Sequence, residues 1–326
     1  MALLLGSLTD DEIEGTNNGD QILALTGDDV VVGRGGADII DGSIGNDILY
    51  GSSKTLWRDG ETDVLNGGEG DDIIYGEFGD VLDGGTGFDR VYLDLSGATE
   101  GLNLDFRPIT IGIDIGLLDL VRVELPLGDG RLANIEVVER LIGTDFNDVF
   151  RMANGEKLGS VVNAGRGDDI VRSMTGDNEL YGEANNDILM TGRGSDKLDG
   201  GAGNDRLSGG RGQDTLTGGV GRDIFIFDEG DSSASRAKAD RITDFSQAER
   251  DKIDLRKMDA NILTEDLDDA FSFIGNERFS GTAGELRFAQ LNGSTFVTGD
   301  VDGDGKGDFQ IELNGLVDLT VADFKL

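Results

Sequence analysis

The chain has 326 residues, with 28 Lys and Arg against 65 Asp and Glu, and its formal net charge is -37. This charge attracts cations and repels nucleic acids and anionic membrane surfaces, so nucleic-acid binding is not expected. Because the sequence contains no Cys and no His, disulfides, thiolate and imidazole metal sites, Ser-His-Asp or Cys nucleophiles, and zinc hydrolases are excluded. Any metal site must therefore be built from oxygen ligands.

The first residues, MALLLGSLTDDE, are not expected to form an export or membrane segment. No basic residue precedes the apolar run, and the run is too short for a secretory signal peptide or a membrane span. We expect residues 1–14 to form an N-terminal cap. In this cap Leu3, Leu4 and Leu5 would seal the end of a solenoid or bind the end of a neighbouring molecule.

Residues 15–91 and 143–226 repeat a phrase rich in glycine and aspartate, as in GGAGNDRLSGGRGQDTLTGGVGRD at 200–223. An apolar residue comes two positions after each phase-marking residue, as Leu207 follows Asp205. A composition bias alone does not lock apolar residues to such a phase. The markers, most of them nine residues apart, are Asp20, Asp29, Asp38, Asp47, Asp63, Asp72, Asp80 and Asp89, then Asp169, Asn178, Asp187, Asp196, Asp205, Asp214 and Asp223.

Each phrase predicts a tight turn followed by a short strand. Six glycine-rich residues can adopt the positive φ angles of a turn, and three residues form a strand with one apolar side chain pointing inward. Two phrases then make one coil, and successive coils stack at about 4.8 Å. The resulting core is thin, whereas ordering the backbone costs about 1 to 2 kcal/mol per residue. Another source of stabilisation is therefore required.

The aspartates indicate what that source is. Carboxylates of equivalent turns stack near one another, where their like charges repel unless a cation lies between them. A hard cation with about six to eight oxygen ligands fits among these carboxylates and the turn carbonyls. Calcium suits this flexible cage better than magnesium, which demands near-ideal octahedral geometry.

In register the phrase reads G-G-x-G-x-D-x-U-x, with U apolar, and it resembles the nonapeptide of the RTX (repeats-in-toxin) proteins. The resemblance implies an all-β fold, a parallel β-roll or β-helix solenoid filled with calcium and closed by a C-terminal β cap. It also implies that carbonyls at positions two and four and the carboxylate at position six bind the ions. Carried onto this chain, the best copies give Gly201, Gly203, Asp205, Gly210, Gly212, Asp214, Gly219, Gly221 and Asp223. Less perfect copies give Gly36, Asp38, Gly45, Asn46, Asp47, Gly68, Gly70, Asp72, Gly85, Gly87, Asp89, Gly165, Gly167 and Asp169, with Asp20, Asp29, Asp187 and Asp196 in the same register.

Two residues depart from this pattern. Asn178 replaces the position-six Asp and Asn18 replaces the position-four Gly, so we expect weaker or water-shared sites there. In the family an ion lies between repeat n and repeat n+2, which gives about nine calcium ions for this chain.

The first array is interrupted at residues 51–62, GSSKTLWRDGET. This loop carries the only Trp, Trp57, beside Lys54 and Arg58. Two interpretations are open: the loop displays Trp57 as a docking hook, or it folds Trp57 back on the roll.

Residues 92–142 lose the glycine and aspartate rhythm and alternate in apolarity, which predicts a joining β segment. The segment NIEVVERLIGTDFNDVF, residues 134–150, resembles the restart of RTX repeats, with Asp148 in phase. This pattern favours one continuous solenoid over two separate domains.

Residues 227–326 leave the repeat pattern. The segments KADRITDFSQAERDKIDL, residues 238–255, and GDVDGDGKGDFQIELNG, residues 299–315, resemble the C-terminal part of serralysin-type RTX exoproteins. The resemblance implies a cap that protects the open strands at a solenoid end. The terminal LVDLTVADFKL resembles the segment that type I secretion systems read, although Lys325 interrupts the usual apolar ending.

The phrase DVDGDG at 300–305 also fits the opening of an EF-hand loop. Position twelve of that loop, where a Glu is required, is Ile311, and Glu312 comes one step late. A cation site and a tight turn without metal therefore both stay open. The oxygen ligands of the cation site would be Asp300, Asp302 and Asp304.

These observations predict a non-catalytic, calcium-binding RTX protein, exported by type I secretion to the cell surface or the medium. It would fold on calcium outside the cell and act as a self-assembling component of a surface layer, filament or biofilm matrix. A protease motif H-E-x-x-H is impossible in this sequence without His, and, because the repeats begin at about Gly15, we expect no protease, lipase or epimerase module ahead of them. A glycosidase built from carboxylates alone stays formally open, although no pair of acids stands apart from the calcium pattern.

Two alternatives to the surface role are a secreted adhesin that binds glycans and the calcium-binding secretion domain of a larger exoenzyme. The expected partners are calcium, copies of the chain itself, or cell-surface polysaccharide. No transmembrane segment is expected.

Overall fold

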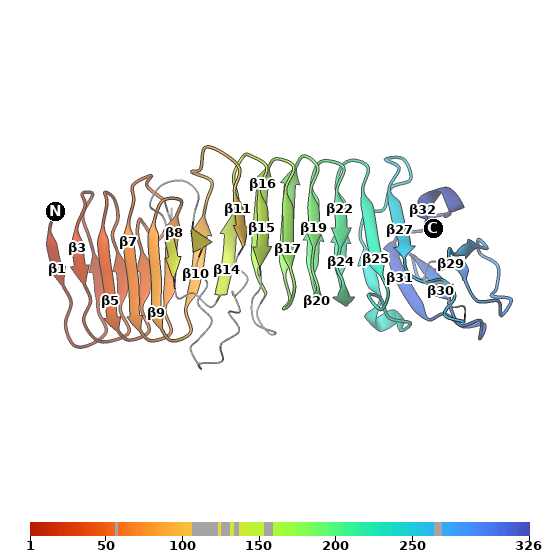
Figure 1. Cartoon of the computed structure of the whole chain (residues 1–326), viewed down its shortest axis with the longest axis horizontal. Helices are drawn as coiled ribbons and strands as arrows, with labels where there is room; N and C mark the ends of the chain where they lie inside the picture. The colour runs from red at the N-terminus through yellow and green to blue at the C-terminus, as the bar shows by residue number, and fades with distance from the viewer. Residues whose placement is uncertain (56–57, 106–122, 125–130, 134–136, 153–158, 264–268) are drawn as a thin grey trace. The chain divides into compact units, whose positions relative to one another are not determined.

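The computed structural model describes residues 1–326 except 56–57, 106–122, 125–130, 134–136, 153–158 and 264–268. The chain divides into two compact units, Met1–Ala164 and Gly165–Leu326. Regular structure in the described residues consists of β-strands and two short 3-10 helices (Figure 1). The all-β fold predicted from the sequence is therefore confirmed. The described residues contain no helix long and apolar enough to cross a membrane.

In the unit Met1–Ala164, successive strands alternate between two sheets (Figure 1). The first sheet contains, in spatial order, β1 (Leu3–Leu5), β3 (Gln21–Leu23), β5 (Ile39–Ile44), β7 (Val64–Glu69), β9 (Val81–Thr86), β13 (Arg131–Ala133) and β12 (Val123–Glu124). The second contains β2 (Glu12–Glu14), β4 (Val30–Val32), β6 (Ile48–Tyr50), β8 (Ile73–Glu77), β10 (Arg90–Asp94) and β14 (Val137–Ile142), which pairs with β16 (Val161–Arg166). A further parallel pair joins β11 (Asn103–Asp105) and β15 (Val149–Met152). All these pairs are parallel except that of β12 with β13.

The strand register confirms the coil predicted from the repeat. Gln21 pairs with Leu3 on one side and with Ile39 on the other, and the matching turn contacts join residues 18 positions apart. Ile39 then pairs with Val64, because the loop at 51–62 lengthens that coil. The roll absorbs this insertion in a turn, so the strands keep their inward and outward faces.

The core of this unit is a thin ladder of the apolar residues predicted from the phase. Those on the first sheet and those on the second are each at most 2% exposed, and they are Ile22, Ile40, Leu65 and Leu82, then Val31, Leu49, Ile74 and Val91. Each three-residue strand of a regular repeat points its central side chain inward, as in Gln21–Leu23. Burial of one such side chain contributes about 1.5 to 3 kcal/mol. That gain is small beside the backbone ordering cost of a coil.

The unit Gly165–Leu326 repeats the same alternation. One sheet contains β17 (Ile170–Ser173), β19 (Ile188–Met190), β22 (Arg206–Ser208), β25 (Ile224–Asp228), β27 (Lys252–Lys257) and β32 (Phe324–Lys325). The other contains β18 (Glu179–Ala184), β21 (Lys197–Asp199), β24 (Thr215–Thr217), β26 (Asp240–Ile242), β31 (Phe309–Asn314), β30 (Ser294–Asp300), β29 (Glu285–Leu291) and β28 (Ser272–Phe273). Turn residues add the pair β20 (Arg193–Gly194) and β23 (Arg211–Gly212), and the 3-10 helices are η1 (Arg236–Lys238) and η2 (Val321–Asp323).

In this unit the winding continues beyond Ile226, where the sequence repeats end. β26 pairs in parallel with β24, and β27 pairs in parallel with β25, so one further coil follows the repeats. β31 then pairs with β26, and β32 pairs with β27. The antiparallel strands β29, β30 and β31 complete this region. C-terminal strands thus extend both sheets of the roll in this unit.

The described ends of the loop at 51–62 are held against the roll. Lys54 Nζ lies 2.5 Å from a carboxylate oxygen of Glu12 in β2, and Arg58 donates a hydrogen bond to Ser96 Oγ. The Glu77 carboxylate accepts two backbone amides of the loop at 2.8 and 2.9 Å. The tryptophan of this loop lies outside the described residues, so both interpretations of its role stay predictions.

Candidate metal sites

The position-six aspartates are buried, although they lie in turns. Each of these residues is at most 2% exposed: Asp20, Asp29, Asp38, Asp47, Asp63, Asp72, Asp80, Asp89, Asp169, Asp187, Asp196, Asp205, Asp214 and Asp223. An aspartate in an ordinary surface turn is solvated, and a carboxylate is almost never fully buried unless it is paired. The repeat therefore brings a large set of carboxyl groups together inside the turns.

Along each side of the roll these residues form a column, which we call an aspartate ladder. One oxygen of each carboxylate, Oδ1, accepts the backbone N–H of the position-six residue one coil earlier, at 2.7 Å from Asp187 to Asp205 and 2.9 Å from Asp205 to Asp223. Within the part of the chain that the structure describes, we trace two such ladders in each unit. They are Asp20, Asp38, Asp63 and Asp80; Asp29, Asp47, Asp72 and Asp89; Asp169, Asp187, Asp205, Asp223 and Asp251; and Asn178, Asp196, Asp214 and Asp240.

The second oxygen, Oδ2, has no hydrogen-bond donor at nine of the described ladder residues. Among the described residues this holds for the buried Oδ2 atoms of Asp29, Asp38, Asp47, Asp72, Asp187, Asp205, Asp214, Asp223 and Asp240. A buried charged oxygen without a donor is costly, and buried polar atoms are nearly always satisfied. The repetition of this feature at equivalent positions indicates a common ligand that accepts these lone pairs.

The position-four glycines complete the cradle with backbone carbonyls. A Cβ added to Gly203 would lie 1.6 Å from the carbonyl oxygen of Asn185, and one added to Gly221 would lie 1.6 Å from that of Gly203. Position-four carbonyls of successive coils thus stack so closely that no side chain fits between them. At position two, the Gly201 carbonyl accepts the amide of Val220 in the next coil at 2.7 Å and keeps its second lone pair.

This donor set fits calcium. It consists of carboxylate and carbonyl oxygens alone, the ligand types that hard divalent cations prefer, and it recurs in each turn at the spacing of the coils. A bound calcium ion would supply the positive charge that buried carboxylates otherwise lack. The ladder aspartates and the position-two and position-four carbonyls named from the sequence would hold it.

Burial raises the pKa of several ladder carboxyls. Removal from water raises the pKa of Asp187 to about 8, and the charges of Asp169 and Asp205 in the same ladder add to the shift. The same cause, with the neighbouring charge of Asp240, raises the pKa of Asp214 to about 9. Without a cation, the folded chain therefore holds protons at neutral pH on Asp187 and Asp214, whereas the unfolded chain has already released them.

This shift predicts how the calcium-free chain responds to pH. Below about pH 4, folded and unfolded carboxyls are both protonated, and the folded state keeps its full stability. As the pH rises above about 4, the aspartates of the unfolded chain ionise first. The free energy of unfolding therefore falls until the pH passes the folded-state pKa of Asp187, about 8. In excess chelator, lowering the pH from 8 to 5 should restore β-sheet circular dichroism. Stability that instead increases with pH in chelator would contradict this prediction.

Two ladder residues escaped the sequence reasoning. Asp240 and Asp251 lie past the last repeat, yet their Oδ1 atoms accept the amides of Asp214 and Asp223, each at 2.9 Å. The signal that marks them is an Ile two positions later, in DRI at 240–242 and DKI at 251–253. The ladders contact residues 26 and 28 positions apart here, so a search for a period of nine misses them.

Some residues in the predicted register occupy other places. Asn46 lies on the exposed side of its turn. Its backbone N–H donates to Asp28 Oδ1, and its side-chain Oδ1 accepts the backbone N–H of Asp71, both at 2.8 Å. It belongs to an outer column of position-five residues and not to the aspartate ladder. Asp148 is buried and accepts the amide of Leu102 at 2.7 Å, in the ladder geometry expected from its phase.

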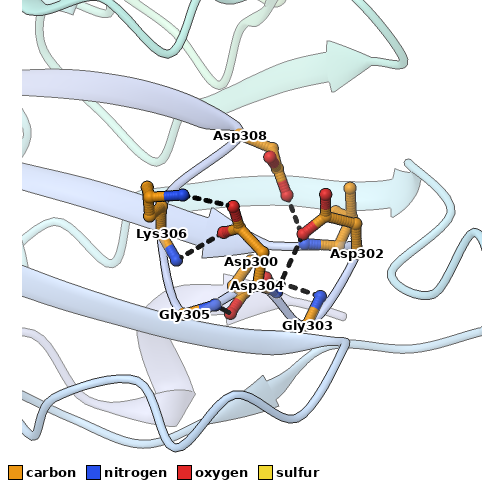
Figure 2. Close-up of polar contacts among 8 residues, drawn as sticks. Asp300, Asp302, Gly303, Asp304, Gly305, Lys306 and Asp308 are labelled. Atoms are coloured by element: carbon orange, nitrogen blue, oxygen red, sulfur yellow. Dashed lines mark hydrogen bonds and ion pairs between the residues drawn. The ribbon is translucent and has the colours of Figure 1, made fainter.

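The predicted loop at 300–305 also brings its acids together (Figure 2). Ligand oxygens of Asp300, Asp302 and Asp304 lie within 4.8 Å of one another. Unlike ladder residues such as Asp205, Asp300 has donors for both oxygens, the amides of Gly303 at 2.7 Å and of Gly305 at 2.9 Å. The turn is therefore satisfied by its own hydrogen bonds, as the metal-free alternative requires, and a cation at this loop stays a prediction.

The chain is similar to a known protein family and to two solved structures. A family model described as "Peptidase M10 serralysin C terminal" matches residues 20–326. The solution structure of the AlgE6R2 subunit of the Azotobacter vinelandii mannuronan C5-epimerase is 25% identical, covering 57% of this chain and 91% of that one, with a TM-score of 0.25. The AlgE6R3 subunit of that epimerase is also 25% identical, covering 56% and 80%, with a TM-score of 0.21.

No curated protein matches the sequence. The family match extends over most of the chain, through the repeats and the C-terminal strands alike. The buried oxygen cradles recur in the same repeats. The chain belongs to the serralysin C-terminal family of RTX-type nonapeptide repeats, whose members form calcium-binding β-rolls.

Proposed function

We propose that this chain is a non-catalytic structural module that folds when it meets calcium outside the cell and then assembles into a surface or matrix component. The observation that carries this proposal is the row of buried Oδ2 atoms, exemplified by Asp205 and Asp223, which lack a protein donor. Extracellular modules bind calcium at about 0.1 to 1 mM, far above its cytosolic level. Folding is then coupled to location.

The C-terminal segment supports export before folding. The terminal LVDLTVADFKL is the part that resembles a type I secretion signal. In the folded chain Phe324 is buried and β32 is paired with β27. A receptor could therefore read this segment only while the chain is unfolded. A calcium-poor cytosol keeps it readable, because the uncompensated ladders oppose folding there.

The strand β1 supports self-assembly. It is the terminal strand of its sheet, and its outward side chains Leu3 and Leu5 are 65% and 62% exposed. A terminal strand with apolar side chains is a template for pairing with another chain. We infer that a second copy pairs along this edge.

Electron microscopy of the purified protein, with millimolar calcium and with chelator, tests this assembly. We expect ordered assemblies with calcium and expanded single chains without it. The double variant Leu3→Lys/Leu5→Lys should prevent assembly but keep the calcium-induced circular dichroism, since charged edge strands resist pairing. Leu316→Lys, which changes an equally exposed leucine (65%) outside the strands, is the matched control. A particle that stays monomeric at every calcium concentration would defeat the assembly proposal.

A second candidate is the calcium-binding C-terminal region of a larger exoenzyme. The family description, a serralysin C terminus, favours it. Intact-mass measurement of the natural secreted product decides between the two candidates. A mass near 34.6 kDa, that of this chain, supports the structural module, and a much larger mass supports the exoenzyme.

A further inference from the structure

The turn at residues 173–178 departs from the repeat at two positions at once. Asn178 stands at position six in place of Asp, and Ser173 stands at position one, where the following turn has Gly182. Both residues are buried, Ser173 at 0% and Asn178 at 1% exposed. Both side chains lie inside the turn, so neither substitution is a change at the protein surface.

The Asn178 side chain spans the gap between two coils. Its amide nitrogen Nδ2 donates to the carbonyl oxygen of Gly176 at 2.7 Å and to Oδ1 of Asp196 at 2.9 Å. Gly176 is the position-four residue of the same turn, and Asp196 is the ladder carboxylate of the next coil. The amide thus bridges the two kinds of oxygen that elsewhere form the cation cradle.

The other end of the amide is satisfied as well. Ser173 Oγ donates to Asn178 Oδ1 at 2.9 Å. In the adjacent ladder, by contrast, Asp187 and Asp205 each keep a buried Oδ2 that has no donor among the described residues. The serine hydroxyl therefore supplies what the ordinary aspartate turns lack, and the two substitutions belong together.

In two further turns a neighbouring hydroxyl side chain also satisfies the position-six residue. Asp20 Oδ2 accepts both the amide and the hydroxyl of Thr16, each at 2.8 Å. Asp148 accepts the amide of Thr144 at 2.8 Å and its hydroxyl at 3.1 Å. In all three turns a hydroxyl side chain at position one or two satisfies the position-six residue. These turns need no cation to complete their hydrogen bonds.

We propose that Asn178 is a built-in substitute for a calcium ion, so that the turn at 173–178 is complete without calcium, whereas aspartate turns whose Oδ2 lacks a donor, such as that of Asp205, require it. A cation placed between Gly176 O and Asp196 Oδ1 would meet the amide hydrogens of Asn178 and not oxygen lone pairs. The substitution also removes one negative charge from the ladder. This inference rests on the proposed calcium binding by the ladders, and it lowers the expected number of ions.

Native mass spectrometry at saturating calcium counts the bound ions directly. Asn178→Asp should bind one ion more than the wild type, because it restores a ladder carboxylate. Asp205→Asn should bind at least one ion fewer, because it removes a ladder carboxylate. Position one of that turn is Gly200, so no hydroxyl is present to complete the turn in place of the ion. Asn292→Asp adds the same charge at an exposed hairpin position and should leave the count unchanged.

If Asn178→Asp does not fold, the double variant Ser173→Gly/Asn178→Asp recreates the ordinary turn and should gain the ion. The inference is overturned if the folded variants keep the wild-type count while Asp205→Asn loses an ion. That result would mean that the wild-type turn already holds calcium. A wild type that binds no calcium at all would instead remove the proposed function itself.

Discussion

Chelation of calcium is expected to abolish most of the β-sheet circular dichroism of this chain at neutral pH, and millimolar calcium should restore it. In chelator each ladder stacks buried carboxyls in a column, as with Asp187, Asp205 and Asp223. If these carboxyls are charged, they repel one another and are poorly solvated. If they are protonated, the folded state is destabilised at neutral pH relative to the unfolded chain, in which the same aspartates are ionised. The single apolar side chain that each strand of a regular repeat buries is too small to offset this cost.

Magnesium and sodium are the controls for this experiment. Magnesium at the same concentration should restore little structure, because the flexible cage of carboxylates and carbonyls does not impose octahedral geometry. Sodium chloride at the same ionic strength screens charge without coordinating the buried oxygens. Recovery of the spectrum in sodium alone, or an unchanged spectrum in excess chelator, would contradict the calcium account.

Replacing Gly221 by Ala is expected to destabilise the calcium-loaded chain by more than about 4 kcal/mol, a size reserved for severe packing or backbone conflicts. The added Cβ would lie 1.6 Å from the carbonyl oxygen of Gly203, and the φ angle of Gly221 is +137°. Relief requires the two coils to separate, which moves the position-four carbonyls out of the cradle. The measurement is unfolding by heat or urea in saturating calcium.

The matched control is Gly293→Ala, in the hairpin turn between β29 and β30. Gly293 also has a positive φ, +90°, but nothing lies within 4 Å of an added Cβ. It should cost only the backbone strain, about 1 kcal/mol. If the two variants were equally destabilised, the glycine at position four would not be required for the close stacking of the coils.

The coil geometry could be predicted because the repeat records it directly. A glycine at position four and an aspartate at position six recur in most of the turns that stack closely on the turn one coil away, as Gly221 does on Gly203. The same spacing also positions a stack of tyrosine rings that was not predicted from the sequence. Tyr50, Tyr75 and Tyr92 each follow a marker by three positions, and their rings stack with centroids 4.4 and 4.6 Å apart.

The remaining features of the site depend on contacts in space that the nine-residue period of the sequence does not indicate. The last ladder residues, Asp240 and Asp251, are hidden by longer turns, although the roll keeps its register through them. The role of Asn178 depends on which atoms its amide reaches across two coils. A sequence shows only that an Asp is missing there. A pairing of Ser173 with Asn178 becomes meaningful once both are known to be buried in one turn.

A crystal structure of the protein grown in millimolar calcium tests the central claim most directly, because anomalous scattering identifies each ion by position. The account predicts calcium about 2.3 to 2.6 Å from Oδ2 atoms such as those of Asp205 and Asp223, with turn carbonyls completing the shell. An intact roll in which these oxygens contact only water, or no ligand at all, would contradict it.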